Sequence, residues 1–150
     1  MKTTALIPAR LESERFPNKL IKKINGIPII LKTYRAALDT GLFENVYVVS
    51  GNDKILELIK SDGGKTFKSQ KIHNSGTDRI AEAAIKLNTD IVVNLQGDEP
   101  FISKNAIGSL IKSFDDENVE MASLMTKFKS FEEVKNPNNV KVIVDVNNNA

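Results

Sequence analysis

Short β-type runs alternate with helical patterns of about three turns along this chain, and this alternation restricts the folds that it can adopt. Apolar runs such as Ala5-Leu6-Ile7 and Ile91-Val92-Val93 are each followed, after a loop, by apolar residues at helical spacing. Parallel strands need a crossover connection of a dozen or more residues, which is usually a helix. The sequence therefore predicts a Rossmann-like α/β fold, with a mostly parallel central sheet flanked by helices.

Proline, glycine and capping residues indicate where these elements begin and end. Pro28 suits the first turn of a helix, and Gly41 suits its end. Asp53 is a candidate cap for the next helix, which Gly63-Gly64 ends. We expect strands over residues 3–7, 46–49, 66–67, 91–95 and 121–125, and helices that begin near residues 28, 53, 77 and 103.

The last strand-like segment breaks the alternation. Residues 140–146 form a β-rich run, and an asparagine turn signal follows at 147–149. This pattern is typical of the first arm of a hairpin whose second arm is not present. We therefore expect residues 1–150 to be the N-terminal portion of a single domain whose C-terminal part is missing.

The composition is that of an ordinary globular protein. The 150 residues are 41% hydrophobic and 27% charged, and 21 basic against 19 acidic residues leave a net charge of +2. Since no strong overall charge attracts a polyanion, we expect no nucleic-acid or membrane partner. No apolar stretch approaches the roughly 20 residues that span a bilayer, and no signal peptide is evident. Together with the absence of cysteine, these features predict a cytoplasmic location.

Three cations occupy the loop that follows the first predicted strand. Arg10, Arg15 and Lys19 are separated by irregular backbone that Pro17 stiffens, so they converge only if the loop curls. Guanidinium groups bind phosphate oxygens in a bidentate manner and lysine acts as a mobile point charge, which together suit a triphosphate. The alternative is a basic loop that simply faces solvent, as most charged residues do.

A second polar segment, from His73 to Arg79, leads into a predicted helix. Ser75 or Thr77 can cap that helix, and Gly76 lets the backbone come close to a flat ligand. Free amides at the helix start suit an anion or a carbonyl acceptor. Arg79 in the first turn opposes the macrodipole, so we expect an anion beside it. The single histidine, His73, favours a hydrogen-bonding or packing role over a catalytic one, and the alternative for the whole segment is a plain capping motif.

A third loop, Gln96-Gly97-Asp98-Glu99-Pro100, directly follows the predicted strand at 91–95. Ligands of open α/β sheets bind in the crevice beyond the carboxyl ends of the strands. Asp98 offers the hard oxygens that Mg²⁺ prefers, and Gln96 suits a sugar hydroxyl or a carboxylate. Acid on this loop and base on the first loop indicate a metal-bound polyphosphate between them. The alternative is a simple turn, since Gly-Asp and Glu-Pro are common turn formers.

Taken together, these segments resemble a known family. The chain resembles the opening of the sugar-activating cytidylyltransferases in the motif Ile7-Pro8-Ala9-Arg10-x-x-Ser13-x-Arg15-x-Pro17-x-Lys19, followed by Gly26-x-Pro28. The match continues in His73-x-Ser75-Gly76-Thr77-Asp78-Arg79, Asn94-x-Gln96-Gly97-Asp98-Glu99-Pro100 and Pro137-Asn138-x-Val140-Lys141-Val142. The chain is most similar to the CMP-Kdo synthetases (3-deoxy-manno-octulosonate cytidylyltransferases), and the resemblance covers essentially its whole length. CMP-sialate synthetases share the fold, but their first loop is typically richer in glycine.

The resemblance implies a nucleotide-diphospho-sugar transferase fold in which residues 1–150 form the nucleotide-binding portion. It implies transfer of a cytidylyl group from CTP to 3-deoxy-D-manno-octulosonate (Kdo), giving CMP-Kdo and pyrophosphate for lipopolysaccharide synthesis. By position, it implies that the triphosphate is bound by Arg10, Ser13, Arg15 and Lys19, and Mg²⁺ by Asp98. It also implies that the cytosine is held by the loop with His73, Ser75, Gly76 and Arg79, and Kdo by Gln96 and Arg79. The catalytic residues would be Arg10, Lys19 and Asp98, which neutralise charge at the transferred phosphate.

The chain departs from the family in two short segments and in length. Leu20 replaces a usual proline, and Ser50-Gly51-Asn52-Asp53 replaces a common Ala-Thr-Asp-Asp. Family members run about a hundred residues further, and that part holds a second metal-binding aspartate, sugar contacts and much of a homodimer interface. We therefore expect little activity from residues 1–150 alone. Two alternatives stay open: a cytidylyltransferase for a related sugar acid (an amino-modified Kdo or a nonulosonate), and a CTP-binding module without catalysis.

Overall fold

The computed structural model describes residues 1–11 and 16–146 of the chain. The chain divides into two compact units, Met1–Lys112 and Ser113–Ala150. The first unit contains, in order, β1 (Thr3–Ala9), the 3₁₀ turn η1 (Lys19–Ile21), β2 (Lys23–Ile24), β3 (Ile27–Pro28), α1 (Ile29–Asp39), β4 (Asn45–Ser50), α2 (Asp53–Ser61), β5 (Lys65–Lys68), α3 (Gly76–Ala84), β6 (Ile91–Asn94) and α4 (Lys104–Lys112).

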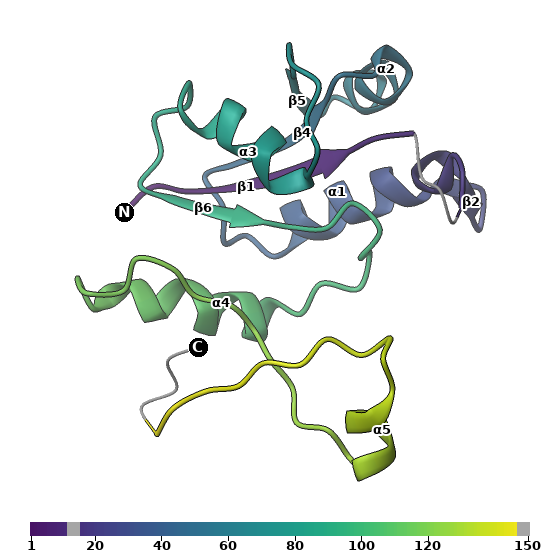
Figure 1. Ribbon diagram of the computed structural model, residues 1–150. Helices are drawn as coiled ribbons and strands as arrows, with labels where there is room; N and C mark the ends of the chain where they lie inside the picture. Colours follow the sequence, from purple (N-terminus) through teal and green to yellow (C-terminus); the bar gives the residue numbers. More distant parts are fainter. Residues whose placement is uncertain (12–15, 147–150) are drawn as a thin grey trace. The chain divides into compact units, whose positions relative to one another are not determined.

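The main sheet of the first unit has four parallel strands in the order β5-β4-β1-β6. From β1 the chain winds outward through β4 to β5 and then crosses back to place β6 on the other side of β1. Figure 1 shows α3 in front of this sheet and α1 and α2 behind it. The predicted α/β fold is therefore confirmed, and the strand order reverses between β1 and β6, which is where ligands bind in such sheets.

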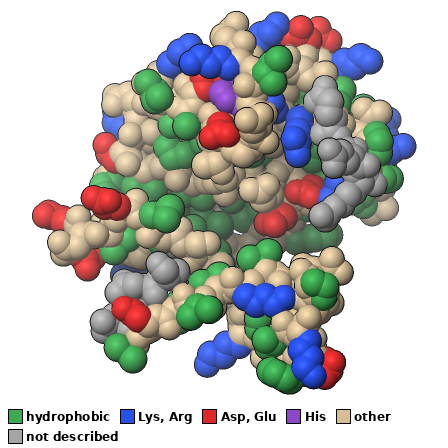
Figure 2. Space-filling view, in the orientation of Figure 1, with side chains coloured by type: hydrophobic (Ala, Val, Ile, Leu, Met, Phe, Trp, Pro, Cys, Tyr) green, Lys and Arg blue, Asp and Glu red, His purple; other side chains and the backbone are tan. Residues whose placement is uncertain are grey.

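Strand β1 lies in the middle of the core, and all seven of its residues are buried. A central parallel strand with helices on both faces needs apolar side chains on both of its sides. On the α3 face, Leu6 and Val49 pack with Ile80 and Ala83. Basic and acidic side chains are interspersed over the face shown in Figure 2. Within the described residues, no helix is both long and apolar enough to cross a membrane.

Hydrogen bonds and backbone angles correct two predicted helix starts. The cap of α2 is Asn52 rather than Asp53, because the Asn52 side chain accepts hydrogen bonds from the amides of Lys54 at 3.1 Å and Ile55 at 3.4 Å. Pro28 is extended, at φ −55° and ψ 141°, and precedes α1 instead of lying in its first turn. Capping propensity alone did not distinguish Asn52 from Asp53, since asparagine and aspartate cap helices equally well.

The sequence analysis missed the antiparallel pair β2–β3. Its two-residue turn is Asn25-Gly26, with φ angles of 52° and 79°. Positive φ at both positions is the type I′ turn, for which Asn-Gly is the strongest short-range hairpin signal. The signal was present in the sequence, and the pair brings Pro28 to the start of α1.

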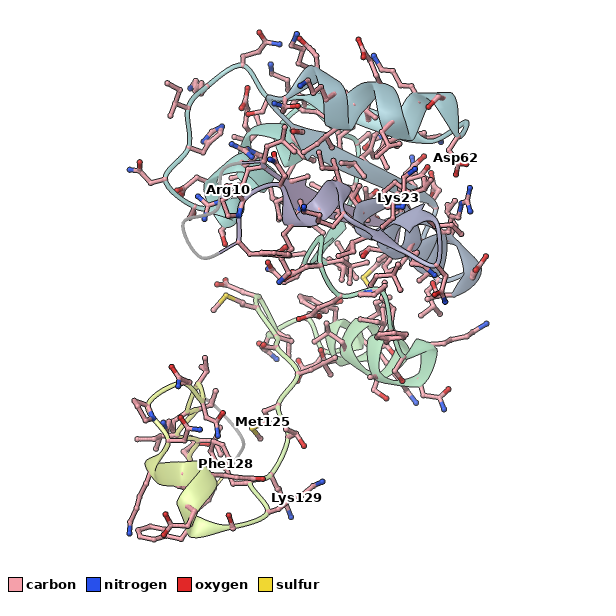
Figure 3. The ribbon with its side chains drawn as sticks, turned by 90° about the vertical axis from the view of Figure 1, so that its right-hand side faces the viewer. Arg10, Lys23, Asp62, Met125, Phe128 and Lys129 are labelled. Carbon is pink, nitrogen blue, oxygen red and sulfur yellow. The ribbon has the colours of Figure 1, made fainter. Side chains whose placement is uncertain are left out.

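In the second unit, the described residues contain the 3₁₀ turn η2 (Ser113–Asp115) and the helix α5 (Phe131–Lys135), which Ser130 caps. The predicted strands over residues 121–125 and 140–146 are wrong, because neither segment is in a strand. A strand is stable only when its backbone groups pair with a neighbour. The described residues of this unit contain no such partner strand, and Figure 3 shows Met125, Phe128 and Lys129 on irregular chain before α5.

Candidate functional site

The point where the strand order reverses brings the first and third polar loops together. The ammonium group of Lys19, which follows β1, donates a hydrogen bond to the Asp98 carboxylate, which follows β6. The two residues are 79 positions apart in the sequence, and their side chains are 42% and 36% exposed. The predicted acid and base therefore face each other as an accessible ion pair, which a ligand can reach from solvent.

Lys19 is placed by a loop that closes on itself. The Asn18 amide donates to the Leu11 carbonyl at 3.0 Å, and Asn18 adopts a left-handed φ of 58°. Lys19 then begins η1, whose next residue, Leu20, is buried. The described ends of the loop are thus brought together by a backbone hydrogen bond, while Ser13 and Arg15 lie outside the described residues.

Asp98 is held in place by its neighbour Gly97. The buried hydroxyl of Thr33 on α1 donates to the Gly97 carbonyl at 3.0 Å. A Cβ atom on Gly97 would lie 3.1 Å from both the Pro8 carbonyl oxygen and Cδ1 of Ile30. Only glycine fits this approach without displacing a neighbour. The sequence analysis missed Thr33, because no local pattern links it to a loop 64 residues away.

Two arginines lie at the carboxyl end of β1. Arg79 donates from Nη1 to the Ala9 carbonyl at 2.7 Å, and its buried Nε has no hydrogen-bond partner among the described residues. Arg10, labelled in Figure 3, is exposed and directly follows β1. The described partner of Arg79 is thus a carbonyl oxygen rather than the anion expected from the sequence. The buried Nε is thus a donor without a partner among the described residues.

Ser75 and Gly76 place the start of α3 against β1. The Ser75 hydroxyl oxygen accepts from the Asp78 amide at 3.1 Å, and the Asp78 carboxylate accepts from the Ser75 amide at 3.2 Å, which completes a capping box. A Cβ on Gly76 would lie 3.2 Å from Cγ of Pro8. Of the two predicted caps, Ser75 is the one used. Both residues bring the start of α3 to Pro8, near the carboxyl end of β1.

His73 has the hydrogen-bonding role that the sequence favoured. Its Nε2 lies 2.6 Å from the Glu82 carboxylate on α3, and each of the two side chains is 9% exposed. Glu82 was missed, because nothing in the sequence distinguishes it from other glutamates on helix faces. His73 thereby links the segment before α3 to the second turn of that helix.

A cavity of about 440 Å³ adjoins the ion pair. It is lined by Lys19, Ile24, Ile29, Asp98, Glu99, Pro100 and Phe101. Ligand pockets of this size combine apolar walls with a few directed polar groups. Gln96 is exposed on the same turn, which the Glu99 amide closes by donating to the Gln96 carbonyl at 3.2 Å.

The donor set suits a metal that arrives with a ligand. The described residues contain no group of three or more His, Cys, Asp or Glu side chains that could hold a metal ion. Mg²⁺ is usually bound by one or two carboxylates together with phosphates and water. Asp98, an accessible carboxylate beside the cation Lys19, fits such shared binding.

Comparison with known proteins gives consistent matches. A profile of the cytidylyltransferase family matches residues 4–150. The chain is 50% identical over 142 residues to the 3-deoxy-manno-octulosonate cytidylyltransferase of Christiangramia forsetii, and 49% identical over 148 residues to that of Flavobacterium johnsoniae. These alignments cover 93% and 97% of this chain but 57% and 61% of the relatives. The chain therefore spans about three-fifths of the length of these relatives.

Solved structures show the same similarity in three dimensions. A structure of CMP:2-keto-3-deoxy-manno-octonic acid synthetase complexed with CTP matches with a TM-score of 0.75 and 35% identity, over 79% of this chain and 50% of that one. A cytidylyltransferase from Leptospira borgpetersenii matches with a TM-score of 0.68 and 28% identity, over 79% of this chain and 51% of that one. The similarity thus includes a relative whose structure contains CTP.

Proposed function

This chain belongs to the cytidylyltransferase family, and we propose that the complete protein transfers a cytidylyl group from CTP to Kdo, giving CMP-Kdo and pyrophosphate for lipopolysaccharide synthesis. The observation that carries the proposal is the Lys19–Asp98 pair at the reversal of strand order. The identity of about half of the aligned residues with Kdo cytidylyltransferases supports the choice of sugar acid.

In this proposal, the triphosphate lies along the loop after β1. Lys19 exchanges its bond to Asp98 for a phosphate oxygen, because a lysine on a half-exposed stem is mobile enough to follow the ligand. Arg10, Ser13 and Arg15 supply further donors from the same loop. Arg79, whose Nη1 donates to the Ala9 carbonyl at the end of β1, adds a further guanidinium on the nucleotide side. Ser75, Gly76 and His73 hold the segment that faces the cytosine.

Mg²⁺ bound with the nucleotide would neutralise phosphate charge at Asp98. In-line attack of the Kdo 2-hydroxyl on the α-phosphorus needs no nucleophilic side chain from the protein. Negative charge grows on the departing pyrophosphate, and in this proposal Lys19 and Arg10 stabilise it. Gln96, exposed on the same turn as Asp98, has the donor and acceptor atoms to bind the sugar acid.

Titration of CTP into residues 1–150, with and without Mg²⁺, tests the nucleotide site. We expect saturable binding that Mg²⁺ strengthens, and we expect Asp98→Asn to abolish the effect of Mg²⁺. Asp62→Asn is the matched control, because Asp62 pairs with Arg35 and lies well away from Arg10 in Figure 3. Equal loss of the metal effect in both variants, or its persistence in Asp98→Asn, would contradict the assignment.

For residues 1–150 alone, we propose CTP binding with little or no turnover. The reason is that the chain spans 57% and 61% of the two Kdo cytidylyltransferases compared above. Release of pyrophosphate by this chain at ordinary enzyme rates would refute this statement. Assay of the complete protein with Kdo, amino-modified Kdo and a nonulosonate separates the preferred substrate from related sugar acids.

We also propose a cytoplasmic homodimer for the complete protein. Residues 1–150 contain no cysteine, which suits a reducing compartment, and CTP is a cytoplasmic substrate. Sedimentation of the complete protein measures the oligomeric state, and a monomer at micromolar concentration would contradict the dimer.

A further inference from the structure

One carboxylate behind the candidate base-binding segment accepts three hydrogen bonds from a single stretch of chain. Glu82 on α3 accepts from the Ser69 hydroxyl at 2.7 Å and from the Gln70 amide at 2.9 Å. Its third partner is Nε2 of His73 at 2.6 Å. All three partners lie within residues 69–73, which connect β5 to α3. Glu82 therefore attaches three residues of this connection to α3, the helix that follows the connection.

The hydrogen bonds to Glu82 determine which ring nitrogen of His73 carries a hydrogen. The three donors lower the pKa of Glu82 from 4.5 to about 2, with the His73 hydrogen bond as the largest cause. Glu82 is consequently ionised at neutral pH and acts only as an acceptor. Nε2 of His73 must then carry the hydrogen of this bond, so in the neutral ring the hydrogen is on Nε2 and not on Nδ1. The carboxylate thus sets both the orientation and the tautomer of the imidazole.

The same stretch is attached at its two ends. The Ser69 amide donates to the Ser50 carbonyl of β4 at 3.0 Å, and Ser75 caps α3. Beyond the cap, Arg79 bonds to Ala9 at the end of β1. Between these attachments, Glu82 is the side chain that holds residues 69–73. Without it, His73 and the backbone before Ser75 lose their common anchor.

We propose that Glu82 is a positioning residue for the nucleotide site: it holds His73 and the connection over residues 69–73 in the conformation that receives the base, without touching the nucleotide. This inference rests on the proposed function, in which residues 73–79 hold the cytosine. It adds a residue on the second turn of α3, behind the surface that the ligand contacts.

The test compares Glu82→Ala and Glu82→Gln with Glu57→Gln, which changes an exposed glutamate on α2. Hydrogen exchange of the Gln70 amide and the ring ¹⁵N shifts of His73 are measured on residues 1–150 without ligand. CTP affinity is then measured by titration. Because a hydrogen bond to a charged group typically contributes about tenfold or more in an equilibrium, we expect Glu82→Ala to speed Gln70 exchange about tenfold and to weaken CTP about tenfold, with the effect of Mg²⁺ unchanged.

Glu82→Gln retains one acceptor oxygen, so we expect a smaller loss of affinity and altered His73 shifts; it also serves if Glu82→Ala does not fold. Glu57→Gln leaves all three measurements unchanged. Unchanged exchange and His73 shifts in a folded Glu82 variant would overturn the proposal, as would changed exchange with unchanged CTP affinity. If the unmodified chain binds no CTP, the proposed function fails for this chain, and unchanged or changed exchange still decides whether Glu82 holds the connection.

Discussion

The hydrogen bond from Thr33 to the Gly97 carbonyl makes a sharp prediction about how the fold supports Asp98. Thr33→Val replaces the hydroxyl by a methyl group of similar size at a site with 0% exposure. The second oxygen near the hydroxyl, the Ile29 carbonyl at 3.2 Å, is four residues earlier in α1 and remains available to the helix amide ladder. The loss therefore falls on the carbonyl of Gly97.

The magnitude follows from two opposing contributions. An unsatisfied buried acceptor costs about 1–3 kcal/mol, and the added apolar surface offsets at most about 0.8 kcal/mol. We expect Thr33→Val to lower the free energy of unfolding by about 1–2 kcal/mol, which is roughly a tenfold change in the unfolding equilibrium. Because Gly97 directly precedes Asp98, we also expect a weaker effect of Mg²⁺ on CTP binding.

Urea unfolding and CTP titration of the same samples measure both effects. Thr40→Val is the matched control, since its buried hydroxyl donates to the Ala37 carbonyl at 2.7 Å near the end of α1. It should lose stability and retain the effect of Mg²⁺, and Thr33→Ser should restore both properties. A Thr33→Val protein with unaltered stability and CTP binding would refute the reasoning.

Two further predictions concern stability. Gly64→Ala places a Cβ 2.5 Å from Cγ2 of Ile59 and 2.9 Å from its carbonyl oxygen, so we expect the melting temperature to fall by the equivalent of about 1–3 kcal/mol. Gly108→Ala is the control: apart from its chain neighbours and the backbone of its own helix, its Cβ meets no described atom within 4 Å, so the change should stabilise α4 by up to about 1 kcal/mol. Equal shifts of the melting temperature in the two variants would contradict the packing argument. The pKa of Glu82 is lowered from 4.5 to about 2, so its contribution to stability is complete above about pH 5 and is lost as the pH falls toward 2. Acid unfolding followed by circular dichroism should therefore be less steep over this range in Glu82→Gln. An acid profile identical to that of the unmodified chain would contradict this prediction.

Much of the first unit could be predicted from local pattern. The strands at β1, β4, β5 and β6 follow from short apolar runs, and the helices between them follow from apolar residues at helical spacing. These signals are local because burial on one face repeats with the period of the element itself. Local pattern did not decide which of two adjacent residues caps a helix, as the cap of α2 at Asn52 shows. The turn at Asn25-Gly26 was readable from the sequence but was not used.

The sequence by itself determined which residue types stand at the ends of the strands, and so the chemistry that the loops can offer. Only the tertiary structure decided which of them meet. The Lys19–Asp98 pair and the Thr33–Gly97 hydrogen bond both join segments whose distance depends on the order β5-β4-β1-β6. The predicted strands at 121–125 and 140–146 failed for the same physical reason. A helix satisfies its backbone hydrogen bonds within its own segment, whereas a strand, like a binding site, depends on partners supplied by distant parts of the chain.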